Sequence, residues 1–545
     1  MNESRGDVTV LDRLETAVDQ GGGRVLFHGD GDPVRVGVRE LFEMAQVRAG
    51  RLRDDGLGVG DRIGIIGPSS PDWIAWAYAM WMIGGAYVPI QIPLRIRDRA
   101  ALARQISAVA DGFECTRIAA HDRFVPLVDE SVVIRWEDTS SSIGPVEQSS
   151  FARVSSDAIA RIIPTSGSTS APKGVSRSYA STGAEAMARG LNPDGLDEVR
   201  YLTYAQIAQA AGLMSVVAPF EPWLVMHMLS PDRFARDPAE LFRLIGRHGV
   251  MMLPAASSAI GSVLRAVKRD PDGVNLSSLV RLTLSFEMVD PTIVDRLLDE
   301  GGRYGLRPEA ICAQYGLSEG GSTRTEPGKG IRIDEVDLDG LVADGVARPA
   351  VRGRPSKRIA SCGNAYLAEM RIAGPSGALP DRHVGEPQFR GGTHLMQGYV
   401  GPGAEDVFLD DGWMSSGDIG YLADGELFVT GRSKEVVIQH GKKYHPEDIE
   451  WAAARGADVA PGECVAFTPV GADEGDIVIA VETALTEGLA DLEQRVRAAV
   501  INQVGIAPRS VIFVTPETLP KTSSGKAQRV EARDRYARGE LSANR

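Results

Sequence analysis

The chain has 545 residues, 43% of them apolar, and this length predicts three or four domain-sized units with a large buried core. Its formal net charge is −14 and its sequence pI is about 5.2. This acidity argues against a nucleic-acid-binding protein and against a basic membrane-surface protein. Any polyphosphate must therefore be held by local donors rather than by a positive field over the whole molecule.

A soluble cytoplasmic protein is expected. Residues 1–14 contain no apolar run of signal-peptide type. Residues 73–90 are free of charge, but glycines and a proline interrupt them, which favours a buried helix followed by a core strand over a membrane span. The cysteines are far apart and form no C-x-x-C pair, which fits a reducing compartment without a disulfide frame or zinc motif. They are Cys115, Cys312, Cys362 and Cys464.

Strands and helices alternate along the first half of the chain, which is typical of layered α/β subdomains. The expected helices are residues 38–52, 71–83, 100–110, 180–190, 238–247 and 257–270. The expected strands are residues 62–67, 86–90, 116–119, 132–136, 224–228, 249–253 and 279–285.

The composition changes in the second half. Residues 320–359 are charged, glycine-rich and weakly periodic, which indicates an insertion or an extended hairpin region. Strands at 370–373, 386–390 and 426–430 predict a β-rich subdomain. Beyond them we expect strands at 436–438, 464–468, 476–482 and 510–514 and helices at 446–454 and 489–503. The prediction is a large N-terminal domain of two α/β subdomains and a β-rich subdomain (residues 1–433), followed by a small mobile α+β domain (residues 434–545).

A strand that leads into a loop rich in hydroxyl groups is the most informative stretch. Residues 162–175 have the sequence I-I-P-T-S-G-S-T-S-A-P-K-G-V. Glycine lets backbone N–H groups turn inward, hydroxyl groups add donors and lysine adds a point charge, so the loop suits phosphate. It is not a Walker loop, because Lys173 precedes Gly174. A flexible surface loop is the alternative for a run of Ser, Thr and Gly.

The order T-S-G-S-T-x-x-P-K-G resembles the phosphate loop of the adenylate-forming superfamily, which includes acyl-CoA synthetases, fatty-acyl-AMP ligases, luciferases and peptide-synthetase adenylation domains. The resemblance implies that this loop binds the phosphates of ATP, with Lys173 also catalytic. The loop residues so implied are Thr165, Ser166, Gly167, Ser168, Thr169 and Lys173.

Two later turns are similar to elements of the same superfamily. Residues 315–319 have the sequence Y-G-L-S-E, and by resemblance Tyr315 packs on adenine beside Gly316, Ser318 contacts the α-phosphate and Glu319 holds Mg²⁺. Mg²⁺ prefers oxygen ligands and needs one or two protein carboxylates. The S-G-D sequence that ends at Asp418 resembles the element whose carboxylate accepts the ribose hydroxyls. Taken alone, each is an ordinary turn.

The last quarter carries two further resemblances. The sequence G-R-S-K-E-V-V-I at residues 431–438, with the later Gly441 and P-E-D-I-E, is similar to the family's hinge signature. It implies that Arg432 reaches the ribose, that Lys434 is the hinge and that Gly441 belongs to the thiol channel. The sequence P-K-T-S-S-G-K at residues 520–526 resembles the closing element, in which Lys526 would be the catalytic lysine. A solvated lysine-rich tail is the alternative.

Within the superfamily the chain most resembles fatty-acyl-AMP ligases. The likeness rests on residues 431–450, on the S-C-G motif at residues 361–363 and on the segment 320–359. That segment lies where those enzymes carry an insertion associated with preference for a carrier protein over free CoA. The resemblance covers essentially the whole chain.

The resemblance implies a ligase of specialised lipid or natural-product metabolism that works in two steps. A carboxylate attacks the α-phosphate of ATP, with Mg²⁺ bound, and pyrophosphate leaves; a phosphopantetheine thiol of CoA or a carrier protein then attacks the acyl-adenylate, and AMP leaves. Catalysis would be positioning and charge neutralisation by Lys173, Glu319 and Lys526. Between the steps the small domain would rotate about Lys434.

Two departures from the family pattern concern the acyl pocket. The H-D-x-G-L element is replaced by Q-A-A-G-L, with Gln209 and Gly212, and the G-A-E element by Ser285, Phe286 and Glu287. Together with Ala313 these residues predict a small or apolar pocket, with Glu287 beside adenine. No Arg or Asp is placed to pair the charges of an amino acid, so an apolar or bulky carboxylic acid is expected.

Two alternatives remain open at this point. The protein could accept a preformed acyl-adenylate, made by a separate adenylating ligase, and catalyse only the thioester step. It could also be a non-catalytic adenylate-binding or carrier-docking protein. Retention of Lys526, Glu319 and Lys173 argues against the first alternative, and retention of Lys526 argues against the second.

Overall fold

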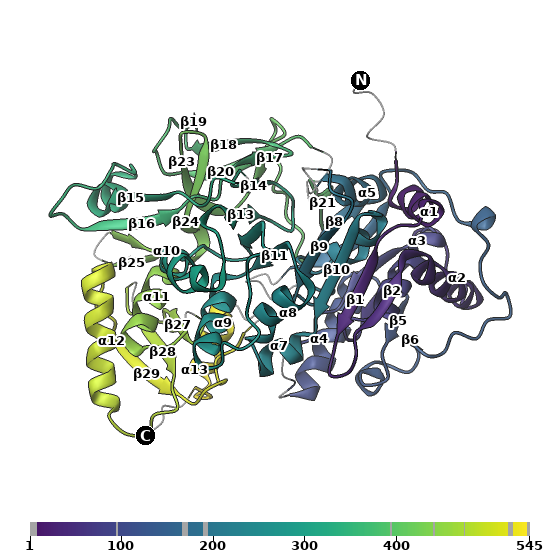
Figure 1. Cartoon of the computed structure of the whole chain (residues 1–545), viewed down its shortest axis with the longest axis horizontal. Coiled ribbons are helices and arrows are strands. Elements are labelled where there is room, and N and C mark those ends of the chain that lie inside the picture. The colour runs from purple at the N-terminus through teal and green to yellow at the C-terminus, as the bar shows by residue number, and fades with distance from the viewer. Residues whose placement is uncertain are drawn as a thin grey trace. The chain divides into compact units, whose positions relative to one another are not determined.

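The computed structural model describes residues 8–93, 96, 98–165, 173–188, 195–326, 328–392, 395–439, 442–460, 462–472, 475–521 and 527–541 (Figure 1). These residues form two compact units. The first comprises residues 1–253, 317–321 and 390–412, and the second comprises residues 254–316, 322–389 and 413–545. The boundaries of these units differ from the expected domain boundary at residue 433, and the expected two-domain division stays a prediction.

The described part of the first unit contains two sheets. One has the order β21 (Gly398–Val400), β8 (Gly174–Ser178), β7 (Ile159–Pro164), β4 (Ala86–Pro89), β3 (Arg62–Ile66), β5 (Arg117–Ala120) and β6 (Val133–Arg135). From β7 to β6 the neighbours are parallel, whereas β8 and β21 add an antiparallel edge. Nearly every residue of β3 and β4 is buried, as expected for strands covered on both faces.

The other sheet of this unit has the order β9 (Val199–Thr203), β10 (Leu224–Leu229), β1 (Arg24–His28) and β2 (Val34–Gly37). β9 also pairs with the first residue of β11 (Met252–Ala255). The helices are α1 (Val10–Gln20), α2 (Val38–Asp54), α3 (Pro71–Met82), α4 (Arg99–Gly112), α5 (Tyr179–Ala188), α6 (Met214–Val217), α7 (Pro231–Arg236) and α8 (Glu240–His248). Short 3-10 turns are η1 (Val125–Leu127), η2 (Gln148–Ser150) and η3 (Ala218–Phe220).

The uncharged segment is a core helix and strand, as predicted. Ser70 caps α3, Pro71 occupies its first turn, and every residue from Trp73 to Met82 is buried. The chain then turns at Gly84 into β4. Among the described residues, no helix has the length and apolar character needed to cross a bilayer.

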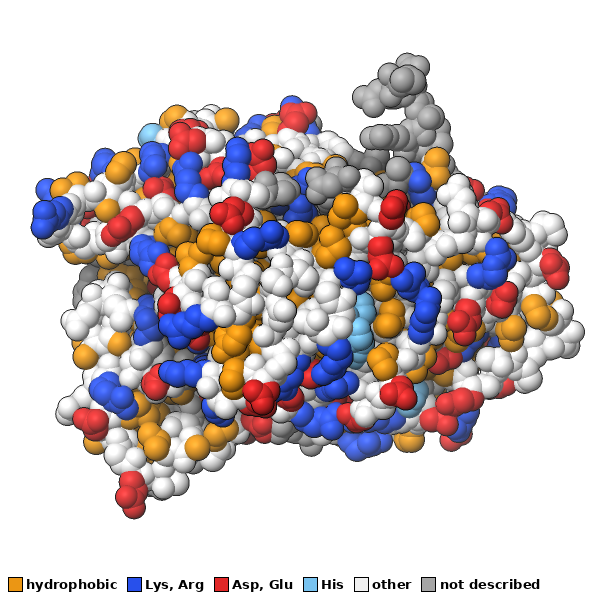
Figure 2. All heavy atoms as spheres, in the orientation of Figure 1, with side chains coloured by type: hydrophobic (Ala, Val, Ile, Leu, Met, Phe, Trp, Pro, Cys, Tyr) orange, Lys and Arg blue, Asp and Glu red, His pale blue; other side chains and the backbone are white. Residues whose placement is uncertain are grey.

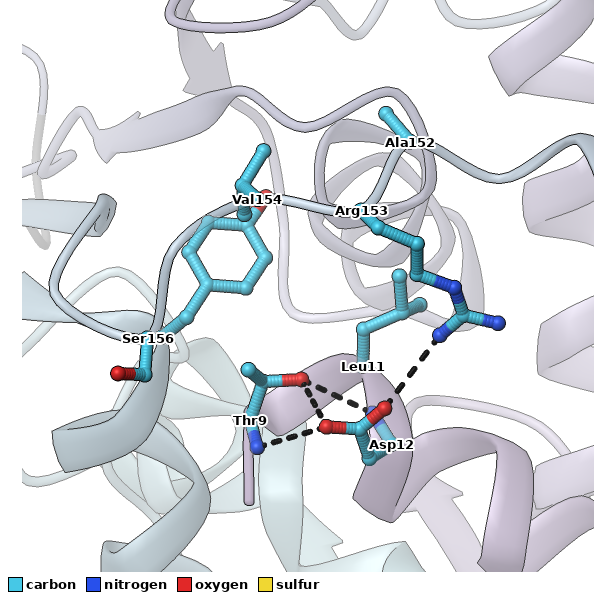
Figure 3. Close-up of a pocket in the computed structure, with 8 residues that line it drawn as sticks. Thr9, Leu11, Asp12, Ala152, Arg153, Val154 and Ser156 are labelled. Atoms are coloured by element: carbon cyan, nitrogen blue, oxygen red, sulfur yellow. Dashed lines mark hydrogen bonds and ion pairs between the residues drawn. The ribbon is translucent and has the colours of Figure 1, made fainter. Parts of the chain in front are cut away.

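The α1 helix and the β1–β2 hairpin were not expected from the sequence. A local signal for α1 exists, because Thr9 and Asp12 form a capping box. The Thr9 Oγ1 accepts a hydrogen bond from the Asp12 N–H at 3.2 Å, and an Asp12 carboxylate oxygen accepts one from the Thr9 N–H at 2.9 Å. Figure 3 shows this box in a pocket of about 320 Å³, where Arg153 points at Asp12. The remaining lining residues are Leu11, Ala152, Val154, Ser156 and Tyr179.

The second unit combines sheet and hairpin elements. In one sheet β12 (Arg281–Leu284) and β13 (Ile311–Gly316) are parallel, and β14 (Ser322–Arg324) and β17 (Asn364–Tyr366) extend it antiparallel. A second sheet has the order β19 (Gly377–Ala378), β18 (Glu369–Gly374), β20 (Glu386–Arg390) and β22 (Met414–Ser415). The hairpins are β15 (Ile333–Asp337) with β16 (Ser356–Ala360), β23 (Asp418–Ala423) with β24 (Glu426–Arg432), and β25 (Val437–Gln439) with β26 (Lys442–Tyr444).

Helices of this unit are α9 (Ser257–Arg269), α10 (Pro291–Arg296), α11 (Pro446–Ala457), α12 (Leu489–Val504) and α13 (Arg529–Ala537). Short turns are η4 (Leu297–Gly301), η5 (Gly302–Tyr304), η6 (Pro308–Ala310), η7 (Gly340–Asp344) and η8 (Ser433–Glu435). Near the C-terminus the sheet β27 (Cys464–Phe467), β28 (Val478–Glu482) and β29 (Ser510–Val514) packs between α11 and α12 on one face and α13 on the other. The predicted fold class is confirmed. The segment 320–359, expected as an insertion or extended hairpin region, contains the β15–β16 hairpin.

The S-C-G motif fastens the β24 strand. The Cys362 N–H donates to the Leu427 carbonyl at 2.7 Å, and the Leu427 N–H donates to the Gly363 carbonyl at 2.9 Å. Gly363 has φ +79°, and a Cβ on it would lie 1.9 Å from the backbone of Arg324. Both the left-handed backbone and the close approach therefore require glycine.

Replacement Gly363→Ala should lower the free energy of unfolding by about 3 kcal/mol or more, because backbone strain and overpacking add. The matched control is Gly353→Ala, which has φ +86° but nothing within 4 Å of the added Cβ, and should cost about 1 kcal/mol. Urea unfolding of both variants measures the difference. Equal losses would show that the contact with Arg324 does not constrain the motif.

Candidate functional site

The phosphate-loop motif connects β7 to β8 in the first unit. Pro164 pairs with Gly174, so the motif begins and ends on two antiparallel strands. At its base both the N–H and the Oγ1 of Thr165 donate to the Lys173 carbonyl, at 3.0 and 3.2 Å. Ser166, Gly167, Ser168 and Thr169 lie outside the described residues.

Two of the predicted catalytic residues share one neighbour, Tyr399. The Lys173 ammonium lies 4.2 Å from the centre of the Tyr399 ring, and the Tyr399 hydroxyl donates to the Glu319 carboxylate. Lys173 also pairs with Glu405 at 2.5 Å. The cause is strand pairing, because β21 lies beside β8 with Tyr399 opposite Val175. Glu319, Tyr399, Lys173 and Glu405 thus form one charged cluster, which we call the loop cluster.

A buried arginine holds the turn that carries Ser318. Arg177, in β8, is only 6% exposed and donates to the Ser318 carbonyl at 2.7 Å. The Met396 N–H donates to the Glu319 carbonyl at 2.7 Å from the other side. The short 317–321 turn is therefore fixed by β8 and by the segment before β21.

In the second unit, three predicted nucleotide-binding residues meet. Asp418 and Arg432 are directly opposite one another at the open end of the β23–β24 hairpin, and Arg432 Nε lies 3.2 Å from Asp418 Oδ1. The Tyr315 hydroxyl donates to Asp418 Oδ2 at 2.6 Å. Burial and the neighbouring Asp418 charge raise the pKa of Tyr315 well above its ordinary value, so the phenol stays a donor. We call Tyr315, Asp418 and Arg432 the ribose triad, after the ribose role that the resemblance predicts for Asp418 and Arg432.

The loop before Asp418 has its own support. The Gly417 N–H and the Ser415 hydroxyl donate to the Glu386 carboxylate at 2.9 and 3.2 Å. The Tyr315 ring stacks on the fully buried Phe389, with centroids 6.0 Å apart. Glu386 and Phe389 both belong to β20, so one strand orients the ring of Tyr315 and the S-S-G turn.

In this unit lie Glu287, predicted to bind beside adenine, and the predicted acyl-pocket residues Ser285, Phe286 and Ala313. Glu287 accepts from the Ser258 N–H at 2.7 Å and from its hydroxyl at 3.2 Å, so it caps the N-terminus of α9. Ser285 is buried and its N–H donates to the Ala255 carbonyl. Phe286, between them, has φ 74° and is 39% exposed. Ala313 is fully buried in β13.

Gln209 and Gly212 lie in the first unit, in a compact turn between β9 and α6. The turn is fastened by Gln206 Nε2, which donates to the Ile92 carbonyl at 3.0 Å, and by the Ile207 N–H, which donates to Ser69 Oγ at 3.0 Å. A Cβ on Gly212 would lie 1.7 Å from the Gln206 carbonyl oxygen, so only glycine fits there. Gln209 is 7% exposed.

The hinge signature follows the ribose triad directly. Lys434 is exposed and lies in η8, the short turn that joins β24 to β25. Arg529, the first residue of α13, pairs with Glu435 of η8 and with Glu447 and Glu450 of α11. Burial lowers the pKa of Arg529, but the negative charges of the neighbouring glutamates raise this pKa by more, so its net shift is upward.

The two ends of the closing element are anchored. Lys521 pairs with Glu482 at 2.7 Å, and Lys521 and Ala527 form an isolated bridge. Lys526 lies outside the described residues, as does Gly441.

The motif residues thus divide into two sets. The first unit holds the base of the phosphate loop, Ser318, Glu319, Gln209 and Gly212; the second holds the ribose triad, Gly316, residues 285–287, Ala313 and Lys434. Sequence reasoning missed Tyr399, Glu405, Arg177 and Glu386. No motif marks them, since each contacts a motif residue far away in the sequence.

Comparison with known proteins gives a consistent result. A family model described as AMP-binding enzyme matches residues 14–400, and one described as Disco-interacting protein 2-like, AMP domain, matches residues 434–545. The protein Rv1013 of Mycobacterium tuberculosis, provisionally named a ligase, is 32% identical over 524 residues, which are 92% of this chain and 94% of that protein. The long-chain-fatty-acid–AMP ligase FadD26 of the same species is 25% identical over 541 residues, 91% and 90% of the two chains.

Solved structures share the fold. A structure from studies of fatty acyl-adenylate ligases of E. coli and L. pneumophila superposes with a TM-score of 0.85 at 23% identity and covers 98% of both chains. The McyG A-PCP structure complexed with phenylalanyl-adenylate superposes with a TM-score of 0.83 at 20% identity, over 98% of this chain and 84% of that one.

His445 makes the hinge region sensitive to acid. It caps α11, its Nδ1 is buried without a hydrogen-bond partner among the described residues, and a Cβ on Gly431 would lie 1.9 Å from it. Burial, then the Lys357 charge, lowers the pKa of His445 below 6.5. The unfolded chain therefore binds this proton more readily, and folded stability is lost as pH falls below about 6.5.

The urea midpoint should fall between pH 7.5 and pH 6.0, and the fall should be smaller in His445→Gln. One proton contributes at most about 1.4 kcal/mol per pH unit, which bounds the difference. The exposed His383→Gln is the matched control and should keep the full slope. An unchanged slope in His445→Gln would contradict the assignment.

Proposed function

The chain belongs to the AMP-binding enzymes, which are adenylate-forming ligases, and from this premise we propose the reaction that it catalyses. It converts an apolar or bulky carboxylic acid and ATP into acyl-AMP and pyrophosphate. It then transfers the acyl group to a phosphopantetheine thiol of CoA or a carrier protein. The observation that carries this proposal is the ribose triad.

The ribose triad has the chemistry of a diol-binding site. Asp418 is 4% exposed and accepts from Tyr315 and Arg432, so its oxygens are held in one orientation. Ribose hydroxyls are donors that match a fixed carboxylate, and Arg432, with a half-exposed side chain, adds donors at the rim. The Tyr315 ring, stacked on Phe389, offers a flat apolar surface for adenine.

The loop cluster has the chemistry of a phosphate-binding and magnesium-binding site. Lys173 supplies a positive charge that Glu405 balances in the structure, and a polyphosphate would replace this carboxylate as its partner. Glu319 fits Mg²⁺, because a single oriented carboxylate beside phosphate oxygens is a common magnesium arrangement. When bound, Mg²⁺ would neutralise phosphate charge.

The adenylation step then needs no covalent protein intermediate. A carboxylate oxygen of the acid attacks the α-phosphorus, the bond to the bridging β-phosphate oxygen breaks, and pyrophosphate leaves. In the second step the thiolate attacks the acyl carbonyl and AMP leaves with the electron pair of the broken C–O bond. Lys173 holds the leaving phosphates, and Lys526 stabilises the reacting oxygens of the first step.

The proposed substrate class rests on the residues that the resemblance assigns to the acyl pocket. Ser285, Phe286, Ala313, Gln209 and Gly212 carry no formal charge. An amino acid would need a partner for its ammonium group, whereas an aliphatic or aromatic acid would not. FadD26 is named for long-chain fatty acids, and a Mycobacterium marinum relative, 26% identical, is named 4-hydroxyphenylalkanoate adenylyltransferase; both support an apolar acid.

The segment 320–359 supports a carrier protein as the thiol donor. By resemblance it is the insertion of the fatty-acyl-AMP ligases. Its β16 strand is fastened to α11 by Lys357 and Asp448, whose side chains meet at 2.6 Å and are 13% and 18% exposed. Its hairpin also packs on the β23–β24 hairpin through Val336, Ile359 and Tyr421.

ATP–pyrophosphate exchange against a panel of carboxylic acids tests the proposed function. Exchange should depend on an apolar acid and fall at least about 100-fold in Lys526→Ala, because a positioned charge on the reacting oxygens is lost. Lys329→Ala, an exposed lysine paired with Glu326, is the matched control and should retain activity. Synthetic acyl-AMP with CoA or a phosphopantetheinylated carrier identifies the acceptor.

Thioester formation from acyl-AMP without any exchange would overturn the proposal. It would show that the chain catalyses the second step alone, which the Gln209 and Phe286 departures would then explain. Inactivity in both assays would favour a non-catalytic adenylate-binding protein.

Asp418→Asn should raise the KM for ATP about tenfold with a smaller change in kcat, since ribose binding contributes equally to ground and transition states. Asp424→Asn, in the turn of the same hairpin, is the control, because this exposed residue has a left-handed backbone that asparagine tolerates. Steady-state exchange kinetics measure both. A KM that stays unchanged in Asp418→Asn would remove the ribose triad from the nucleotide site.

A further inference from the structure

Three histidines from distant parts of the sequence converge in the first unit. His28 is the last residue of β1, His227 lies in β10 and His248 is the last residue of α8. β1 and β10 are parallel, with Leu26 opposite His227 and His28 opposite Leu229. Residues two apart in a strand share a face, so His28 and His227 lie on the same face of the sheet.

The three imidazoles are close enough to share one ligand. His28 Nε2 and His227 Nδ1 are 3.0 Å apart, and the ring centroids are separated by 4.7 to 5.2 Å. Each ring can present one nitrogen, and the three nitrogens all lie within 4.8 Å of one another. Among the described residues, these three histidines are the group of His, Cys, Asp or Glu side chains whose ligand atoms lie this close together. In Figure 2 histidine atoms reach the surface in the region where Figure 1 places β1, β10 and α8.

The cluster buries three polar rings in one place. His28 and His227 are 2% and 3% exposed, and His248 is half-buried. Burial of polar groups costs free energy, so three apolar side chains would be a less costly way to fill this space.

The surroundings keep the imidazoles neutral. Burial, then the neighbouring His248, lowers the pKa of His28 to about 4 and that of His227 to about 3. The nearby arginines are ion-paired: Arg24 and Arg200 with Glu198, and Arg233 and Arg247 with Glu240. Their charge is thus partly balanced, and the C-terminal end of α8, with its carbonyl groups, favours a cation at His248.

We propose that His28, His227 and His248 form a site for one Zn²⁺ ion. Imidazole nitrogens are ligands that zinc prefers, and three of them with a solvent molecule complete a tetrahedron. At a Zn–N distance of about 2.0 Å, neighbouring ligand nitrogens in a tetrahedron lie about 3.3 Å apart. His28 Nε2 and His227 Nδ1, 3.0 Å apart, are therefore close to the required separation. The His248 ring would reach the ion by a small rotation. The partial exposure of His248 gives the ion a route from solvent.

The ion would act as a structural clip, separate from the nucleotide chemistry. It would link two strands and a helix whose ligands are up to 220 residues apart in the sequence. Cross-links that close long loops restrict the unfolded chain, and binding to the folded state alone raises its stability. The inference does not depend on the proposed ligase reaction.

The test uses the full-length chain, stripped with a chelator and dialysed against Zn²⁺. Elemental analysis should find one zinc per chain that is lost in His248→Ala, and Zn²⁺ should raise the melting temperature of the wild type but not of the variant. Co²⁺ in place of zinc should give the visible absorption of a tetrahedral site. His383→Ala, a histidine outside the cluster, should keep the ion and the shift.

A second variant distinguishes loss of a zinc ligand from misfolding. His28→Gln keeps the size and polarity of the side chain but removes a ligand, and the affinity for Zn²⁺ should fall at least about tenfold while the circular dichroism spectrum stays unchanged. No stoichiometric zinc in the wild type would overturn the proposal. So would zinc that His248→Ala and His28→Gln both retain.

Discussion

The β23–β24 hairpin is the element on which the second unit depends. Its centre is the stack of Tyr421 on Phe428, two fully buried rings with centroids 5.1 Å apart and nearly parallel planes. This stack constrains the register of the hairpin, because a slip of one strand by one residue would turn its ring to the opposite face. The register shifts between Gly420 and Ile419, and beyond this shift Asp418 lies opposite Arg432 at the hairpin's open end. The arrangement of the ribose triad thus depends on both the stack and this shift.

The same hairpin joins the site to the hinge. Arg432 ends β24, Lys434 follows it at once, and Gly431 packs against the His445 ring at the start of α11. Arg432, with its predicted ribose role, and Lys434, the predicted hinge, are therefore only two positions apart on one stretch of backbone.

The sequence predicted the elements whose signals are local. The uncharged α3–β4 segment and the β3 strand were found from apolar patterning, and the ends of the phosphate loop from glycine, proline and lysine. The α1 helix was missed although Thr9 and Asp12 cap it, because a capping box without a long apolar stripe is a weak signal. The α13 helix was missed for a similar reason, since Ala532 is its buried residue.

The supporting residues of the site could not be predicted in this way. Tyr399 reaches Lys173 and Glu319 because β21 pairs with β8, and Glu386 reaches Gly417 because β20 pairs with β22. Both depend on pairings between strands far apart in the chain, which no local pattern encodes. Glu287 is a further case: its predicted nucleotide role stays a prediction, and its contacts with the Ser258 N–H and hydroxyl at the start of α9 could not be read from the motif.

Phe286 shows how the scaffold holds a reshaped position. A left-handed backbone at a bulky residue costs of order 1–3 kcal/mol and persists only where neighbours impose it. Here the constraint comes from both sides, because Ser285 is bonded to Ala255 and Glu287 is bonded to Ser258. The backbone at 286 is therefore set by its flanking residues, and the side chain can change without altering its path. A side chain of different size at such a point leaves the strand and helix beside it unchanged, which is how one fold can carry different sites.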